Sequence, residues 1–138
     1  MLALLQNVIT TVLTRSEHVN ASKKIGNRGE ATARRYLKRL GWRLIAKNLC
    51  FGNDELDILA VSPCEKILAI VEVRTTEDAL KKPESTLTKK KRTAMLRVAK
   101  RLNSTAIKHS CELRVDLIAV RINGHKPTIS HYEGIFLL

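Results

Sequence analysis

Three charged residues in the middle of the chain are spaced so that they could form a metal-dependent catalytic site. Asp57 lies in the segment DELDILAV, and Glu72 and Arg74 lie at the end of the apolar segment ILAIVEVR. Because side chains alternate between the two faces of a strand, Glu72 and Arg74 share one face. If the two segments are antiparallel neighbours, Asp57 and Glu72 can lie side by side. Their charges would then repel unless a cation or a proton lies between them.

The segments that carry these residues predict two strands at the centre of a sheet. Residues 55–61 and 67–74 are separated by a Pro-containing turn, and up to Arg74 the second segment is apolar on both faces except for Glu72. Such a strand is typically covered on both sides. A carboxylate in it must be paired, hydrogen-bonded or metal-bound, because an isolated buried charge is very costly. The alternative to a metal site is a structural ion pair with Arg74 or Arg114.

Two helical residues could complete the site. Glu30 is the only acid among eight basic residues between Lys23 and Arg43, and it flanks an apolar stripe. Its alternative role is that of a solvated acid in the first helical turn. Lys91 lies on the inward side of a second helix, near its start, and could deliver an amine to the same strands. Alternatively, its stem covers the sheet while its charge lies in water.

The remaining elements follow from apolar periodicity and turn residues. Their order, α-β-β-β-α-β-β, indicates an α/β fold with a mixed central sheet flanked by helices. Residues 1–22 are predicted to be an N-terminal helix or tail with a linker, and residues 23–138 to be one domain. The predicted elements outside the central strands are a helix at 23–41 closed by Gly41, an edge strand at 42–50, a helix at 85–106, a strand at 111–122, an Asn123–Gly124 turn and an edge strand at 127–132.

The composition favours a polyanionic partner. With 25 Lys and Arg against 13 Asp and Glu, the formal net charge is +12. Nucleic acid is the first candidate partner and an anionic membrane surface the second. Aromatic residues make up 4% of the chain, which favours phosphate contacts over base stacking. The candidate phosphate-binding residues lie on the two basic helices: Arg34, Lys38, Lys89, Lys90, Arg92 and Arg97.

The three cysteines bear on the cellular location of the protein, and residues 1–14 bear on membrane attachment and on dimer formation. Cys50, Cys64 and Cys111 are odd in number and lack metal-ligand spacing, so we expect reduced thiols in a cytoplasmic compartment. The histidines form no ligand spacing either, which argues against a zinc site. Residues 1–14 are mostly apolar but too short to span a bilayer, and they lack the features of a secretory signal. They are interpreted as a helix that packs on the domain or on a second copy in a homodimer, or as a disordered tail.

The segments GNRGEATARRYLKRLGW, ELDILAV, VEVR, KKKRTAMLRVAKRL and RVDLIAV, in this order, resemble the YraN-like family of small uncharacterised proteins. That family is similar to the PD-(D/E)XK nuclease superfamily and close in layout to archaeal Holliday-junction resolvases. The resemblance covers residues 23–136. It implies a restriction-endonuclease-like three-layer core and a metal-dependent endonuclease, with Mg²⁺ or Mn²⁺ as cofactor and DNA, branched or structured, as substrate.

The resemblance also assigns roles by position. The helix acid falls on Glu30, the metal-binding aspartate on Asp57, the second carboxylate on Glu72 and the catalytic lysine on Arg74. Arginine keeps its charge and cannot act as a base, but it can stabilise a phosphate in the transition state. We therefore predict that Lys91 supplies the amine that the superfamily places beside the second carboxylate.

The chain departs from the superfamily pattern at three positions. Asp54 replaces the glycine of the Gly-Glu-Ile-Asp motif, Arg74 replaces lysine, and Arg92 replaces a common glutamine. The change at Arg74 supports a second hypothesis, a non-catalytic nucleic-acid-binding module on a nuclease scaffold. A third hypothesis is a membrane-surface protein anchored by residues 1–14. Asp116, on the next strand, is predicted to support the fold.

Overall fold

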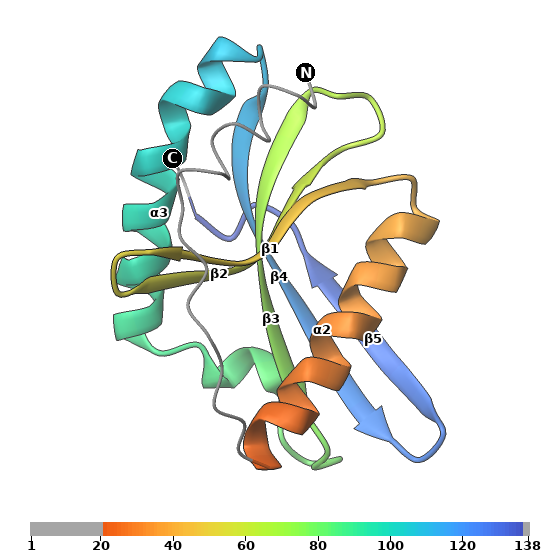
Figure 1. Cartoon of the computed structure of the whole chain (residues 1–138). Helices are drawn as coiled ribbons and strands as arrows, with labels where there is room; N and C mark the ends of the chain where they lie inside the picture. The colour runs from red at the N-terminus through yellow and green to blue at the C-terminus, as the bar shows by residue number, and fades with distance from the viewer. Residues whose placement is uncertain (1–20, 137–138) are drawn as a thin grey trace.

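Five strands form one mixed sheet at the centre of the computed structural model, which describes residues 21–136 (Figure 1). The strands are arranged in sequence order across the sheet, with β3 and β4 parallel and the other neighbours antiparallel. The predicted α/β fold, with its element order and its two edge strands, is confirmed. The elements are α2 (Ala21–Arg39), β1 (Arg43–Phe51), β2 (Asp54–Val61), β3 (Ile67–Thr76), the 3₁₀ turn η1 (Pro83–Thr86), α3 (Lys89–Lys108), β4 (Glu112–Asn123) and β5 (Lys126–Tyr132).

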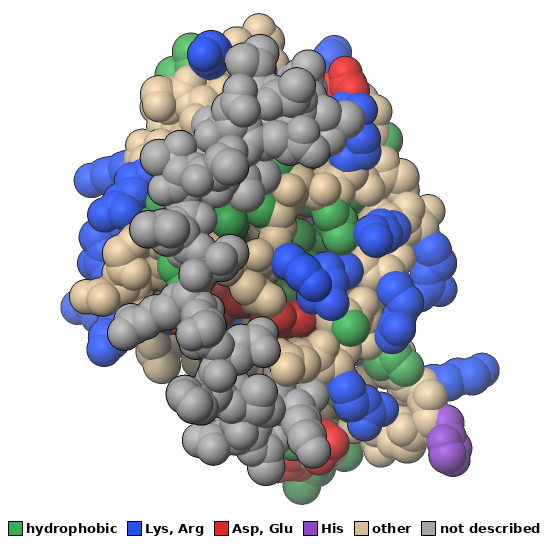
Figure 2. All heavy atoms as spheres, viewed as in Figure 1, with side chains coloured by type: hydrophobic (Ala, Val, Ile, Leu, Met, Phe, Trp, Pro, Cys, Tyr) green, Lys and Arg blue, Asp and Glu red, His purple; other side chains and the backbone are tan. Residues whose placement is uncertain are grey.

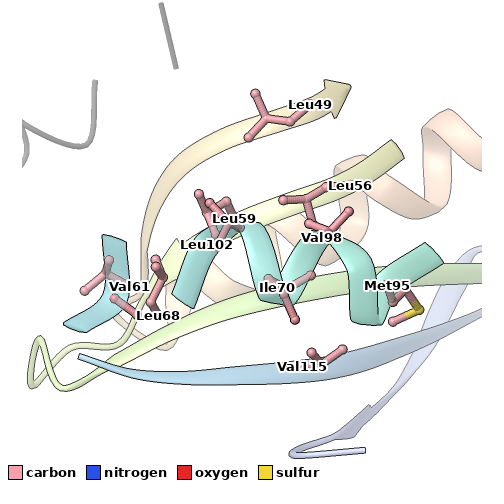
Figure 3. Packing of buried hydrophobic residues seen from close by; sticks show 12 residues of the cluster. Leu49, Leu56, Leu59, Val61, Leu68, Ile70, Met95, Val98, Leu102 and Val115 are labelled. Carbon is pink, nitrogen blue, oxygen red and sulfur yellow. The ribbon is translucent and has the colours of Figure 1, made fainter. Parts of the chain in front are cut away.

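Helix α3 covers one face of the sheet. Figure 3 shows Met95, Val98 and Leu102 of α3 lying against Ile70 of β3 and Val115 of β4. These side chains are at most 2% exposed. Because β3 and β4 are parallel, the chain must cross over between them, and α3 is that crossover. The packing fixes α3 along the sheet and thereby sets where its first turn lies.

Helix α2 covers the opposite face. Ala33 and Leu37 are fully buried in a second apolar cluster, together with Ile58 of β2, Val71 of β3 and Ile118 of β4. Burial on both faces explains why β3 is apolar at nearly every position. The sheet and its two helices make the three-layer core expected from the resemblance.

The start of α3 differs from the predicted helix. Helical structure was expected from residue 85, but residues Pro83–Thr86 form the separate turn η1. The side chain of Thr88 then caps α3 by accepting a hydrogen bond from the backbone N–H of Lys91 at 3.2 Å. Lys91 therefore lies in the first turn of α3.

The other helix and strand boundaries differ from the predicted ones by one or two residues. Helix α2 begins at Ala21, two residues before the predicted start, so part of the expected linker is helical. Strand β2 begins at Asp54, one residue before the predicted start at residue 55. Gly41 follows α2 with a φ of +84°, as its predicted role as a helix terminator requires. The predictions for residues 1–14 lie outside the described residues. Between residues 21 and 136, the structure contains no helix that is long and apolar enough to cross a membrane.

Candidate active site

Strands β2 and β3 part at the position of the predicted carboxylate pair. Their ladder runs from Val61↔Leu68 to Ile58↔Val71, and one further step would pair Asp57 with Glu72. At this point the Asp57 carboxylate accepts a hydrogen bond from the backbone N–H of Val73 at 2.8 Å. Asp57 therefore lies near enough to Glu72 for its charge to raise the pKa of that carboxyl group.

Glu72 is a buried carboxylate between two cations. Its Oε1 atom lies 3.4 Å from Nε of Arg74, and its Oε2 atom lies 3.2 Å from Nζ of Lys91. Burial and, after it, the charge of Asp57 raise the pKa of Glu72 to about 8, although Lys91 and Arg74 act in the opposite direction. The residue is 4% exposed. A carboxyl group in this environment favours a bound proton or an added cation.

Lys91 enters the site from the first turn of α3. Besides contacting Glu72, its ammonium donates a hydrogen bond to the backbone carbonyl of Glu55 at 3.2 Å. Its side chain is 21% exposed. These two contacts disagree with the alternative in which the charge of Lys91 lies in water, and they place its amine beside the second carboxylate.

Glu30 approaches the site from the opposite side, in the middle of α2. The helix comes so close to β3 at the preceding residue that a Cβ atom on Gly29 would lie 1.7 Å from Oγ1 of Thr75. Burial and then the charge of Asp57 raise the pKa of Glu30, while Arg34, 4.0 Å away, lowers it. Glu30 is therefore not a solvated acid of the first helical turn, and the charge of Asp57 acts on its carboxyl group.

The donor set fits a hydrated magnesium or manganese ion. Mg²⁺ is usually held by one or two carboxylates and keeps several of its waters. Asp57 and Glu72 provide such a pair, and the effect of Asp57 on the pKa of Glu72 is the repulsion that a cation would relieve. Within residues 21–136, no three Asp, Glu, His or Cys side chains are gathered into a ready metal-binding group. Glu30 is thus close to Asp57 without completing a set of three.

Asp116 belongs to a different cluster on the α2 face of the sheet. Arg114 donates to both of its carboxylate oxygens at 2.8 and 2.9 Å, and His131 lies 2.9 Å away. The backbone N–H of Gly134 donates to it at 3.0 Å. Arg114 is therefore paired with Asp116, and the suggested ion pair between Arg114 and Glu72 is absent from the described part of the chain.

The predicted phosphate-binding residues occupy different environments. Lys89, Lys90 and Arg92 are exposed at the start of α3, close to Lys91. Arg97, in contrast, forms a bidentate ion pair with Asp54 at 2.9 and 2.7 Å. On α2, Arg34 neighbours Glu30, whereas Lys38 is exposed. Figure 2 shows Lys and Arg side chains along the edge where Figure 1 places α3, and acidic side chains near the middle of the same face.

Two features of the site were not predicted from the sequence. The backbone carbonyl of Glu55 holds Lys91, and no sequence pattern marks a carbonyl for that role. Arg121 lies on the same face of the sheet as Arg74, on the neighbouring strand β4. A signal for Arg121 did exist, because it follows the apolar run LIAV of β4 as Arg74 follows the apolar run of β3.

The chain is similar in sequence to a family of known proteins. The family model "Uncharacterised protein family UPF0102" matches residues 29–120. The chain is 32% identical to a UPF0102 protein of Trichlorobacter lovleyi, over 83% of this chain and 91% of that protein. It is 31% identical to one of Pelobacter propionicus, over 85% of both chains, and 34% identical to one of Nitratidesulfovibrio vulgaris, over 86% and 87%. The predicted YraN-like family, a PD-(D/E)XK-like branch of the nuclease superfamily, is thereby confirmed. The chain belongs to the uncharacterised protein family UPF0102.

Proposed function

We propose that this protein is a metal-dependent endonuclease that hydrolyses phosphodiester bonds of DNA, with branched or structured DNA as the candidate substrate. The observation that supports it most is the position of Glu72, buried where β2 and β3 part, beside Asp57 and 3.2 Å from the amine of Lys91. Hydrolysis of a phosphodiester requires charge neutralisation, an activated water and a group that can move a proton. The carboxylate pair, with a bound cation, and the two basic side chains match these requirements.

Each residue has a role in this proposal. Asp57 and Glu72 would hold Mg²⁺ or Mn²⁺, and Glu30, which is near Asp57, would be the third acid of the site. When bound, the ion would lower the pKa of a water ligand and neutralise the phosphate. Arg74 would stabilise the negative charge that develops on the phosphate, because its guanidinium is a permanent cation. Lys91 would orient the attacking water and take part in its proton transfer.

The charge of the chain supports nucleic acid as the partner. A net charge of +12 attracts the phosphate backbone irrespective of base sequence. The exposed residues Lys89, Lys90 and Arg92 lie in the same helical turn as Lys91, so phosphates bound there would bring a strand to the carboxylates. A cytoplasmic location and a homodimer are further predictions from the sequence.

One observation favours a second candidate, a non-catalytic nucleic-acid-binding module. Glu72 already contacts both Lys91 and Arg74, so two cations offset its charge without a metal. Arg74 cannot supply the base that lysine provides. In this second candidate the site would be a structural ion cluster, and DNA binding would be independent of divalent ions.

A cleavage assay tests the proposal. The purified protein is incubated with linear, flapped and four-way DNA in Mg²⁺, Mn²⁺ or EDTA, beside the variants Asp57→Asn and Glu72→Gln. We expect cleavage that requires the metal and is lost in both variants, while DNA binding in EDTA persists. Cleavage that survives in both variants would assign the activity to another site or to a contaminant. Tight DNA binding without cleavage of any substrate would support the second candidate.

A further inference from the structure

Arg121 lies on the same face of the sheet as the candidate site. Strands β3 and β4 are parallel, with Arg74 paired to Ala119 and Thr76 paired to Arg121. Paired residues of neighbouring strands point to the same face, so Glu72, Arg74 and Arg121 share one face of the sheet. Helix α3 covers this face at Ile70 and Val115, nearer the start of the two strands. Arg74 lies between Glu72 and Arg121 along the strand direction. Its neighbour Ala119 is small and leaves the two arginines unseparated by a bulky side chain.

Both arginines have a polar group that lacks a partner. Within residues 21–136, the Nε atoms of Arg74 and Arg121 are buried and make no hydrogen bond. Nε of Arg74 lies 3.4 Å from Oε1 of Glu72 in an ion pair, without forming a hydrogen bond. Arg121 donates only from a terminal nitrogen, to the backbone carbonyl of Lys81 at 3.2 Å. Buried donors are almost always satisfied in folded proteins, so two neighbouring exceptions call for an explanation.

An anion with several oxygens would match the guanidinium groups of these two arginines, and a turn of either side chain would expose its Nε donor to that anion. A guanidinium presents Nε and a terminal nitrogen as a fork that matches two oxygens of a phosphate. Strand β5 adds Ser130 beside Ala119 and Thr128 beside Arg121, both exposed. Two acids lie near this surface: Glu72, which pairs with Arg74 and Lys91, and Glu84 of η1, whose carboxylate accepts a hydrogen bond from the hydroxyl of Tyr132 at 3.0 Å. The surface thus combines two arginines, two exposed hydroxyl-bearing residues and two acids that already have partners.

We propose that Arg121 and Arg74 together bind the phosphate that neighbours the scissile one on the nucleic-acid strand. Arg74, between Arg121 and Glu72, contacts both phosphates, and Arg121 contacts only the neighbouring one. The strand then runs from the carboxylates across β4 toward β5, beside η1. The identity of the anion as a nucleic-acid phosphate rests on the proposed function, whereas the binding of a phosphate by the two arginines does not.

Binding of flapped DNA in EDTA, over a series of salt concentrations, tests this phosphate site without cleavage. Arg121→Gln is expected to weaken affinity roughly tenfold at low salt, since it removes charge-assisted hydrogen bonds. It should also reduce the magnitude of the slope of log affinity against log salt by about 0.9, the value for one phosphate contact on a duplex. Arg121→Lys keeps the charge but not the forked pair of donors. Its DNA affinity should therefore lie between that of Arg121→Gln and that of the unmodified protein.

The matched control is Arg39→Gln, the same change at an exposed position at the end of α2. It should leave both affinity and slope close to those of the unmodified protein. Equal losses in Arg39→Gln and Arg121→Gln would reduce the effect to net charge and overturn the proposal. If Arg121→Gln fails to fold, Arg121→Lys carries the comparison, and an affinity equal to that of the unmodified protein would also overturn it.

A second measurement separates this proposal from the nuclease activity. Inorganic phosphate alone should raise the melting temperature of the unmodified protein and of Arg39→Gln, and it should raise that of Arg121→Gln much less. In one outcome, the protein cuts no DNA, while its DNA affinity and its stabilisation by phosphate both depend on Arg121. That outcome would reject the nuclease activity and keep the phosphate site. In the opposite outcome, the protein cleaves DNA in a metal-dependent way, but Arg121→Gln leaves DNA affinity and stabilisation by phosphate unchanged. That outcome would reject the phosphate site and keep the nuclease activity.

Discussion

The Nζ atom of Lys91 lies 3.2 Å from Oε2 of Glu72, so an amine from the first turn of α3 reaches the second carboxylate of the candidate site. Superfamily members usually place a lysine two residues after that carboxylate, on the same strand. Here the strand position holds Arg74, and the amine comes from a helix that follows in the sequence. The arrangement supplies both a permanent cation and a group that can exchange a proton.

The roles of Lys91 and Arg74 can be separated by cleavage kinetics. Lys91→Met should lower the Mn²⁺-supported rate about 100-fold or more if Lys91 takes part in proton transfer. Metal binding, measured as a thermal shift, should persist in this variant. Arg74→Lys keeps the charge and should change the rate less. An unchanged rate in Lys91→Met together with a faster rate in Arg74→Lys would show that Lys91 has not taken over the lysine's role.

Metal binding should be visible as stabilisation of the fold. A ligand that binds only the native state at 100 times its Kd stabilises it by about 2.7 kcal/mol, so Mg²⁺ or Mn²⁺ should raise the Tm. Asp57→Asn should abolish this shift. The variant should also raise the metal-free Tm, because it removes the repulsion with Glu72, and its amide oxygen can still accept the hydrogen bond from Val73. The control is Glu112→Gln, at an exposed carboxylate at the start of β4. An unchanged metal response in Asp57→Asn would reject the metal site.

DNA affinity should depend on salt concentration and on the basic residues at the start of α3. Charge reversal at Lys89 and Lys90 should lower affinity for every base sequence about equally, because phosphate contacts carry no sequence information. The matched control is Lys108→Glu at the opposite end of α3. Arg97→Glu should additionally lower the Tm, since it breaks the bidentate pair with Asp54. Retention of a strong sequence preference at high salt would contradict a phosphate-based mode of binding.

The close contact between α2 and β3 should tolerate no side chain. A Cβ atom on Gly29 would lie 1.7 Å from Oγ1 of Thr75, so Gly29→Ala should destabilise the fold by about 1–3 kcal/mol. Gly26→Ala in the same helix is the control, because a Cβ atom there meets nothing within 4 Å. It should stabilise the protein by up to about 1 kcal/mol through helix propensity. Chemical denaturation measures both changes, and equal effects would contradict the close contact.

The cluster around Asp116 predicts a specific response to acid. Burial acts to raise the pKa of Asp116, but hydrogen bonds from His131, Arg114 and Gly134 outweigh it, and the net pKa lies below its ordinary value of 3.8. A depressed carboxyl pKa contributes stability above the unfolded pKa, and that contribution is lost as pH falls through the folded pKa. Asp116→Asn should cost about 1–3 kcal/mol at pH 7, since it removes the buried charge that accepts two hydrogen bonds from Arg114 and leaves that guanidinium with Glu133, 3.3 Å away, as its acidic partner. In urea titrations the difference from the unmodified protein should shrink below pH 4. A difference that stays constant from pH 7 to pH 3 would argue against this ion cluster.

Much of the fold follows from local sequence patterns. The apolar run of β3 predicted a central strand covered on both faces, and Gly41 predicted the end of α2. The face shared by Glu72 and Arg74 followed from strand alternation alone. These features depend on backbone geometry and on side-chain periodicity within one segment. The start of α3 was harder to predict, because the residues from Ser85 onward fit a helix, whereas the separate turn η1 extends to Thr86 and Thr88 caps α3.

The sequence by itself determined which residue types were available for the site, the strands that carry Asp57 and Glu72, and the positive charge that favours nucleic acid. Only the tertiary structure decided which partners these residues have. Lys91 and Arg97 both lie on α3, yet one contacts Glu72 and the other pairs with Asp54. Likewise, Arg121 shares a face with Arg74 because β3 and β4 are parallel and in a particular register. The physical reason is that periodicity fixes the direction of a side chain within its own element, whereas contacts between elements depend on where each helix begins and on how the strands align, which packing of the whole chain determines.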